Sequence, residues 1–138
     1  ILLKKYKKLN FNVRGCDTVK ANVLLGKLLN YKVELIDFNN MKNIKNIKIF
    51  ENTIIVSYHC FEHLENPFLS LNTLYNIMPK KSYLQIEVPI EEIKIPNTRF
   101  GHLQTFYKYD LKKMLEKCGF IFLNSYYDSK NERHLVEK

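Results

Sequence analysis

The stretch Ile54–Pro67, IIVSYHCFEHLENP, constrains the fold of this chain more than any other feature. It begins as an apolar run, then presents two histidines, a cysteine and a glutamate, and ends on Asn66 and Pro67, a favoured pair at the start of a helix. A buried strand that carries polar side chains at its carboxyl end and leads directly into a helix is typical of ligand sites in open α/β sheets. We therefore expect the functional site here.

Helical and extended patterns alternate along the rest of the chain. Apolar spacing predicts helices over residues 1–9, 18–29, 66–78 and 109–117. In the second of these, the expected buried face consists of Val19, Val23, Leu24, Leu28 and Leu29. Strands are predicted over residues 11–17, 32–36, 54–57, 83–88 and 120–124, with a sixth beginning near residue 134. Residues 39–48 are expected to form a loop with at most a helical turn, and residues 90–105 a functional loop. This order predicts one α/β domain over residues 1–138, Rossmann-like, with a mostly parallel sheet and helices on both faces.

Composition narrows the function classes. The net charge of +8 invites a nucleic-acid partner, but lysine is abundant along the whole chain, and the one cluster, Lys4 to Lys8, falls on the polar face of a helix. We read that cluster as a solvated face, with an anion-binding patch as the alternative, and expect no nucleic-acid partner. No apolar run approaches the roughly 20 residues of a membrane span. Three widely spaced cysteines fit a reducing, cytoplasmic compartment rather than a disulfide framework.

Four sequence pieces, taken in order, resemble the class I S-adenosylmethionine-dependent methyltransferases, specifically the small-molecule type with a Glu-His-Leu signature. The pieces are Val13-x-Gly15-x-Asp17; Ile36-Asp37-Phe38; Phe61-Glu62-His63-Leu64-x-Asn66-Pro67; and Glu87-Val88-Pro89 followed by His102-x-x-x-Phe106 and Leu111-x-x-x-Leu115-x-x-x-Gly119-Phe120. Their order and spacing across nearly the whole chain, rather than any single piece, carry the resemblance.

The resemblance implies S-adenosylmethionine as the cofactor and assigns residues to it. Asp17 would hold the ribose hydroxyls, since a carboxylate accepts two hydrogen bonds from vicinal hydroxyls. Asp37 and Phe38 would lie near the adenine, and Ser57 and His59 would complete the cofactor site. Two local alternatives stay open: Asp17 could cap a helix, and Phe38 could pack in the core.

The chain also departs from the family pattern. The family's first strand and glycine-rich loop are absent and would be expected just upstream of Ile1, because residues 1–9 resemble the helix that follows that loop. A methyltransferase domain without them would have a disturbed cofactor site and exposed sheet edges. In addition, Lys80-Lys81-Ser82 stands where the family has paired glycines, so the turn there is expected to differ.

The polar cluster offers two kinds of chemistry. His63 and His102 are the predicted catalytic residues, because methyl transfer needs a base for the acceptor proton and histidine titrates near neutrality. Glu62, His63 and His102 could instead bind a divalent metal, as in some methyltransferases that resemble this chain, but a metal is not the favoured interpretation. The sequence His59–His63 also matches the zinc-protease motif H-x-x-E-H, but that motif needs a continuous helix, which is not expected here. Cys60 is expected to be a structural thiol.

The predicted function is therefore that of an enzyme, a methyltransferase that moves a methyl group from S-adenosylmethionine to oxygen or nitrogen of a small metabolite such as a sugar, lipid precursor or quinone. The first alternative is a degenerate or truncated methyltransferase-like domain that serves as a binding or scaffold module. A lesser alternative is an RNA methyltransferase. The partner is expected to be the small-molecule acceptor, and a homo-oligomer is compatible with the sequence.

Overall fold

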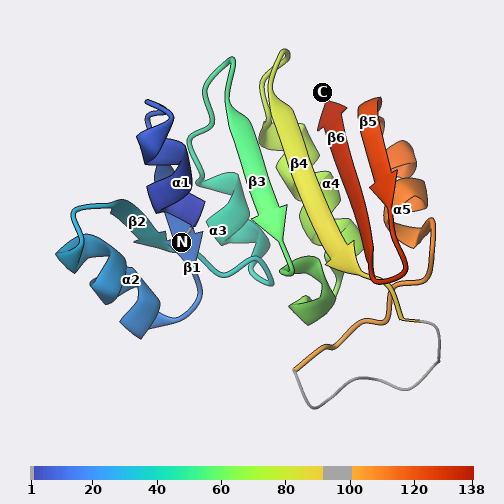
Figure 1. Cartoon of the computed structure of the whole chain (residues 1–138), viewed down its shortest axis with the longest axis horizontal. Helices are drawn as coiled ribbons and strands as arrows, with labels where there is room; N and C mark the ends of the chain where they lie inside the picture. The colour runs from blue at the N-terminus through green and yellow to red at the C-terminus, as the bar shows by residue number, and fades with distance from the viewer. Residues whose placement is uncertain (1, 92–100) are drawn as a thin grey trace.

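The described residues form two separate sheets, one of two strands and one of four (Figure 1). The computed structural model describes residues 2–91 and 101–138. A two-stranded sheet pairs β1 (Arg14–Asp17) with β2 (Lys32–Leu35). A four-stranded sheet has the order β3-β4-β6-β5, formed by β3 (Ile54–Tyr58), β4 (Tyr83–Pro89), β6 (Asn131–Glu137) and β5 (Ile121–Tyr127).

The four-stranded sheet is mixed, so the prediction of a mostly parallel sheet is wrong for it. β3 and β4 are parallel, but β6 runs antiparallel to both β4 and β5. The reason is the short connection between β5 and β6, which only an antiparallel pair can use. Asp128 Oδ1 closes this turn by accepting hydrogen bonds from the backbone N–H groups of Lys130 and Asn131, each at 2.7 Å.

Three of the helices, α3, α4 and α5, lie on one side of the four-stranded sheet, behind it in Figure 1. The helices are α1 (Leu2–Lys8), α2 (Lys20–Leu28), α3 (Met41–Lys45), α4 (Pro67–Ile77) and α5 (Asp110–Cys118). Between α4, α5 and the sheet lies the core, which includes the fully buried Leu71, Leu84, Ile86, Leu111 and Leu115. None of the helices in the described ranges is long and apolar enough to cross a membrane.

Several predicted features of the helices are confirmed. α4 begins as expected, with the Asn66 side chain accepting a hydrogen bond from the Leu69 N–H at 3.0 Å and Pro67 in the first turn. Gly119 ends α5 in the left-handed conformation with φ of 93°. Where a loop with at most a helical turn was expected, α3 forms a short helix that Asn40 caps through the Lys42 N–H.

The predicted buried face of α2 is largely wrong. Val23 is buried, but the other members of that face are exposed, and Leu28 is 80% exposed. The reason is that α2 packs only on a narrow two-stranded sheet. In the part of the chain that the structure describes, β1 pairs only with β2, and β3 pairs only with β4. Each of these strands therefore has one edge that pairs with no other strand.

Candidate functional site

The chain reverses direction immediately after β3, and this places the polar residues. His59 has φ of 49°, a left-handed conformation that is uncommon outside glycine, and its N–H donates to the Glu87 carbonyl at 3.1 Å. The short 3-10 helix Phe61–His63 follows, with Phe61 and Glu62 turned into the protein. The absence of a continuous α-helix here confirms that the zinc-protease reading fails.

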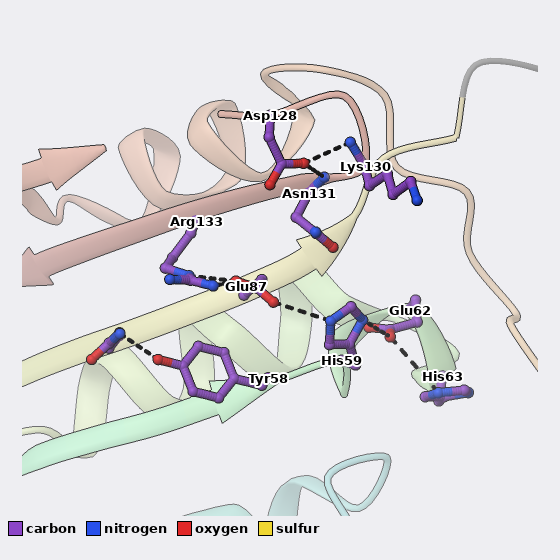
Figure 2. Close-up of polar contacts among 10 residues, drawn as sticks. Tyr58, His59, Glu62, His63, Glu87, Asp128, Lys130, Asn131 and Arg133 are labelled. Carbon is purple, nitrogen blue, oxygen red and sulfur yellow. Dashed lines mark hydrogen bonds and ion pairs between the residues drawn. The ribbon is translucent and has the colours of Figure 1, made fainter. Parts of the chain in front are cut away.

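A buried carboxylate forms the centre of what we call the His–Glu cluster, made up of His59, Glu62, His63 and His102. Glu62 is only 1% exposed, and neither of its carboxylate oxygens has a hydrogen-bond partner among the described residues. Its Oε1 lies 3.6 Å from His59 Nδ1 and 3.8 Å from His63 Nε2, so two imidazoles face the same oxygen (Figure 2). One ligand-type atom each of Glu62, His63 and His102 lies within 4.8 Å of the others.

His102 reaches the cluster because the segment that follows the undescribed loop is tied to Glu62. The Glu62 carbonyl accepts hydrogen bonds from the N–H groups of Leu103 and Gln104 at 2.8 and 2.9 Å. The His102 ring then lies edge-on to the His63 ring, with centroids 5.0 Å apart. The structure therefore unites both predicted catalytic histidines, which are far apart in sequence.

Both of these histidines are held by acceptors, which determines their tautomers. His63 Nδ1 lies 3.0 Å from the carbonyl oxygen of Gly101, and His102 Nδ1 lies 3.0 Å from Glu91 Oε1. Because a carbonyl or carboxylate oxygen only accepts, each Nδ1 carries the hydrogen. In the neutral form, each ring then carries its lone pair on Nε2, the usual arrangement of a histidine that serves as base or ligand.

His59 also belongs to a series of polar side-chain contacts that runs across β3, β4 and β6. Its Nε2 lies 3.1 Å from Glu87 Oε1, and Glu87 also pairs with the Arg133 guanidinium from β6 (Figure 2). The guanidinium lies over the ring of Tyr58, with 5.4 Å to its centroid. His59 is therefore braced by β4 and β6 while its other nitrogen faces Glu62.

Burial controls the electrostatics of the site. Desolvation raises the pKa of Glu62, and the neighbouring imidazoles of His63, His59 and His102 oppose this rise. Desolvation, helped by the Glu62 charge, raises the pKa of Cys60 to about 11. Cys60 therefore stays a neutral thiol near neutral pH, which agrees with a structural role.

The residues that the resemblance assigned to the cofactor lie at the carboxyl ends of the strands. Asp17 ends β1 opposite Leu35 at the end of β2. The segment after β2 contacts the segment after β3, because the Asn39 side chain accepts from the Glu65 N–H and the Phe38 carbonyl accepts from the Ser70 hydroxyl, each at 2.8 Å, so these strand ends lie at one edge of the molecule. The Asp17 carboxylate accepts hydrogen bonds from the Val19 N–H at 2.8 Å and the Asn22 side chain at 3.0 Å. It thus forms a local turn directly before α2, whose N-cap residue Val19 has no side-chain cap.

The remaining assigned residues have local roles as well. Asp37 Oδ1 accepts from the Asn39 N–H at 2.9 Å, and Phe38 packs against the core. Ser57 is partly buried on β3, next to the His–Glu cluster. A carboxylate has about four lone-pair positions, so Asp17, with two of them used, retains acceptor capacity for a pair of hydroxyls. On this observation the residues present fit a nucleoside ligand.

Two residues that hold the histidines in place, Glu91 and Gly101, were not predicted from the sequence. Glu91, which holds His102, lies in the loop directly after the predicted end of a strand, and its position there was a signal for a site residue. Gly101 contributes only a carbonyl, for which the sequence has no signal. The rest of the loop that was expected to line the acceptor pocket, residues 92–100, lies outside the described residues.

A separate hollow lies at the other end of the small sheet. It has a volume of about 580 Å³ and is lined by Asn12, Arg14, Lys27, Tyr31, Lys32, Val33, Glu34 and Phe50. Arg14 and Lys32 are the first residues of β1 and β2, so this hollow lies at the amino ends of the strands, away from Asp17. It is therefore not part of the candidate site.

Comparison with known proteins identifies the fold. No family model and no curated protein matches the sequence. Among solved structures, a SAM-dependent methyltransferase from Archaeoglobus fulgidus is 18% identical with a TM-score of 0.75, over 99% of this chain and 80% of that one. TehB from Haemophilus influenzae is also 18% identical, with a TM-score of 0.69, over 95% of this chain and 51% of its own.

A third similar structure contains ligands. It is the 1,6-didemethyltoxoflavin-N1-methyltransferase of Burkholderia thailandensis, solved with 1,6-didemethyltoxoflavin and S-adenosylhomocysteine bound. It is 12% identical with a TM-score of 0.70, and the match covers 98% of this chain and 64% of that protein. At these identities the likeness concerns the fold and not the reaction. The chain has the α/β, Rossmann-like fold of the class I S-adenosylmethionine-dependent methyltransferases.

Proposed function

We propose that the protein is an enzyme that transfers the methyl group of S-adenosylmethionine to oxygen or nitrogen of a small metabolite. The observation that carries this proposal is the convergence, in a methyltransferase fold, of the carboxyl ends of β1 and β2, which include Asp17, with the segment after β3 that carries the His–Glu cluster. In open α/β sheets, ligands bind outside the carboxyl ends of the strands. Methyl transfer needs two things from the protein: a group that binds the nucleoside part of the cofactor and a base that takes the proton of the acceptor. Both lie at these strand ends.

In this proposal the cofactor supplies a methyl group on a positively charged sulfur, an activated donor. Asp17 binds the ribose hydroxyls with the acceptor capacity that its two local hydrogen bonds leave. Asp37 and Phe38 border the adenine, and Ser57 and His59 complete the pocket beside β3. What the protein adds is alignment of the acceptor with the methyl group and exclusion of water.

His63 is the better placed of the two proposed bases. Its side chain is 42% exposed, so an acceptor can reach it, and its tautomer presents Nε2 as the proton acceptor. His102 is more buried, at 13%, and its bond to Glu91 orients its ring against His63. We propose that His63 takes the proton of the methyl acceptor and that His102 holds the His63 ring in position.

Calorimetric titration of the full-length protein with S-adenosylhomocysteine tests the proposal. We expect micromolar binding that Asp17→Asn weakens at least about tenfold, since one lost hydrogen bond to a charged group is worth about 1.5–3 kcal/mol. The matched control is Glu51→Gln, an exposed carboxylate in the turn before β3, which should bind like the wild type. Absence of binding by folded full-length protein would refute the enzyme proposal.

One observation favours a second candidate, a methyltransferase-like binding or scaffold module. In the described structure, β1 and β2 form a sheet of their own and pair with no strand of the four-stranded sheet, so the sheet structure is interrupted near the proposed cofactor site. A module that has lost cofactor binding would give no heat with S-adenosylhomocysteine in the same titration, while its circular dichroism and unfolding transition would show a folded protein.

A further inference from the structure

We infer that Ser125, His134 and Glu132 form a second reactive site, which hydrolyses aryl esters of short acyl groups through an acyl-serine. The three residues lie on β5 and β6, at the opposite edge of the four-stranded sheet from β3 (Figure 1). The site is therefore separate from the His–Glu cluster and independent of the proposed methyl transfer. Three observations support it: a continuous series of hydrogen bonds, a carboxylate that backbone groups hold in place, and an exposed serine.

The series of hydrogen bonds joins the three side chains. Ser125 Oγ lies 2.8 Å from His134 Nδ1, and His134 Nε2 lies 2.8 Å from Glu132 Oε1. Ser125 and His134 are cross-strand partners, and Glu132 is two residues before His134, so all three side chains lie on one face of the sheet. A serine bonded to a base that a third group orients is the arrangement that activates serine nucleophiles on unrelated folds.

The proton positions suit this role. Glu132 Oε2 accepts from the Tyr109 N–H at 2.7 Å, and Oε1 accepts from the Lys112 N–H at 2.9 Å while it faces His134 Nε2. A carboxylate that only accepts places the imidazole hydrogen on Nε2. In the neutral ring, His134 Nδ1 then has the lone pair, and the Ser125 hydroxyl donates to it. His134 is thus oriented to take the proton that Ser125 loses when it reacts.

Of the three side chains, the nucleophile is the exposed one. Glu132 and His134 are both 0% exposed, whereas Ser125 is exposed. Among the described residues β5 pairs only with β6, so the backbone N–H groups along its outer edge have no strand partner. Such groups can donate to the carbonyl oxygen of a substrate as that oxygen becomes negative, which is the role of an oxyanion hole.

The surroundings of His134 indicate the substrate class. The rings of Phe122 and Tyr127 stand edge-on to the imidazole, with centroids 5.1 and 5.5 Å away. Aromatic rings beside the serine favour a substrate with an aromatic leaving group. Because Ser125 lies at an exposed strand edge, the ester must also be reactive in itself. An aryl ester of a short acyl group meets both conditions.

The reaction balances without a cofactor. Ser125 Oγ forms a bond to the ester carbonyl carbon while its proton passes to His134 Nδ1. The bond from that carbon to the phenol oxygen then breaks, and the phenol leaves with the proton. Water attacks the acyl-serine, one of its protons returns through His134 to Ser125 Oγ, and the carboxylic acid leaves. Ester and water thus give acid and phenol.

Labelling of the full-length protein with a fluorophosphonate tests the site, because this reagent forms a P–O bond with an activated serine and releases fluoride. We expect mass spectrometry of the digested protein to find one adduct per chain, on Ser125. p-Nitrophenyl acetate should acetylate the same residue. Ser125→Ala should abolish both modifications. The matched control is Ser129→Ala, an exposed serine in the turn between β5 and β6, which should be labelled like the wild type.

Variants of the two buried residues test the roles of base and carboxylate. His134→Gln should slow the labelling of Ser125 at least about 100-fold, and Glu132→Gln at least about tenfold. Rates are expressed per folded molecule, from the unfolding curve of the same sample, so a purely structural role would leave them unchanged. Wild-type rates in both folded variants would overturn the inference.

The remaining outcomes do not depend on those buried variants. Ser125→Ala removes an exposed hydroxyl and should fold, so the site stays testable if neither of the others folds. A folded wild type that is not labelled, or a label distributed equally over Ser125 and Ser129, would overturn the inference. Titration of Ser125→Ala with S-adenosylhomocysteine reports the proposed cofactor site separately, so either conclusion can fail alone.

Discussion

Removal of the Glu132 carboxylate should destabilise the protein more than any other single change on β6. Glu132 is fully buried, and its Oε2 accepts from the Tyr109 N–H at 2.7 Å. Its Oε1 accepts from the Lys112 N–H at 2.9 Å and lies 2.8 Å from Nε2 of the buried His134. Tyr109, which precedes α5, has no side-chain cap and a φ of 74°. The β6 carboxylate therefore caps α5 and holds a strained residue.

The magnitude follows from these three contacts. A hydrogen bond to a charged group contributes about 1.5–3 kcal/mol, but N–H groups at a helix terminus regain part of this from water once the carboxylate is gone. His134 would stay buried with one nitrogen unpaired. We therefore expect Glu132→Ala to lower the free energy of unfolding by about 3–5 kcal/mol. Glu132→Gln keeps one acceptor oxygen and should cost about 2–3 kcal/mol.

Urea denaturation followed by circular dichroism measures these differences. The control is Glu137→Gln on the same strand, a half-buried carboxylate that should change the free energy of unfolding by no more than about 0.5 kcal/mol. If both Glu132 variants fall within 1 kcal/mol of the wild type at an unchanged urea dependence, the inferred cap does not stabilise α5 and the reasoning is refuted.

Three further predictions concern the backbone and a thiol. Lys81 has φ of 61°, a conformation that glycine adopts without strain, so Lys81→Gly should raise the free energy of unfolding by about 0.5–1 kcal/mol. The control Lys80→Gly relieves no such strain and should lower the free energy of unfolding. The opposite order of the two variants in urea denaturation would contradict this. A Cβ at Gly26 would lie 2.6 Å from Val33 Cγ2, so Gly26→Ala should cost about 1–2 kcal/mol, and a smaller cost in a Val33→Ala background would confirm the clash. Because burial raises the pKa of Cys60 from 9.0 to about 11, the unfolded chain loses that proton first, and stability should fall as pH rises from 9 to about 11. Mass spectrometry should also find Cys60 alkylated more slowly at pH 8 in the folded protein than in urea.

Much of the fold could be predicted because its signals are local. The start of α4 at Asn66 and Pro67 and the end of α5 at Gly119 depend on capping and backbone conformation that the residues themselves favour. The turn at Lys80 and Lys81 was expected to differ from a glycine-containing turn. The backbone nevertheless takes the left-handed conformation at Lys81 that a glycine would favour, because the hydrogen bonds around it dictate its path.

Other features could not be predicted from local patterns. The insertion of β6 between β4 and β5 depends on the pairing of β4 with a strand far along the chain, which the alternation of apolar residues does not predict. The exposed face of α2 has apolar spacing like that of a buried helix, and only the width of the sheet beneath it decides its burial. Periodicity reports which face of an element is apolar and not whether a partner covers it.

For the candidate site, the sequence by itself determined its chemistry and its approximate place: histidines and a glutamate directly after an apolar strand, and Asp17 at the end of another. Only the tertiary structure decided that His102 joins His63, that both rings are held through Nδ1, and that the buried Glu62 side chain has no hydrogen-bond partner among the described residues. The physical reason is that residue type and strand order are encoded locally. The burial, tautomer and spacing of a cluster arise from contacts between segments about 40 residues apart, which exist only once the chain has folded.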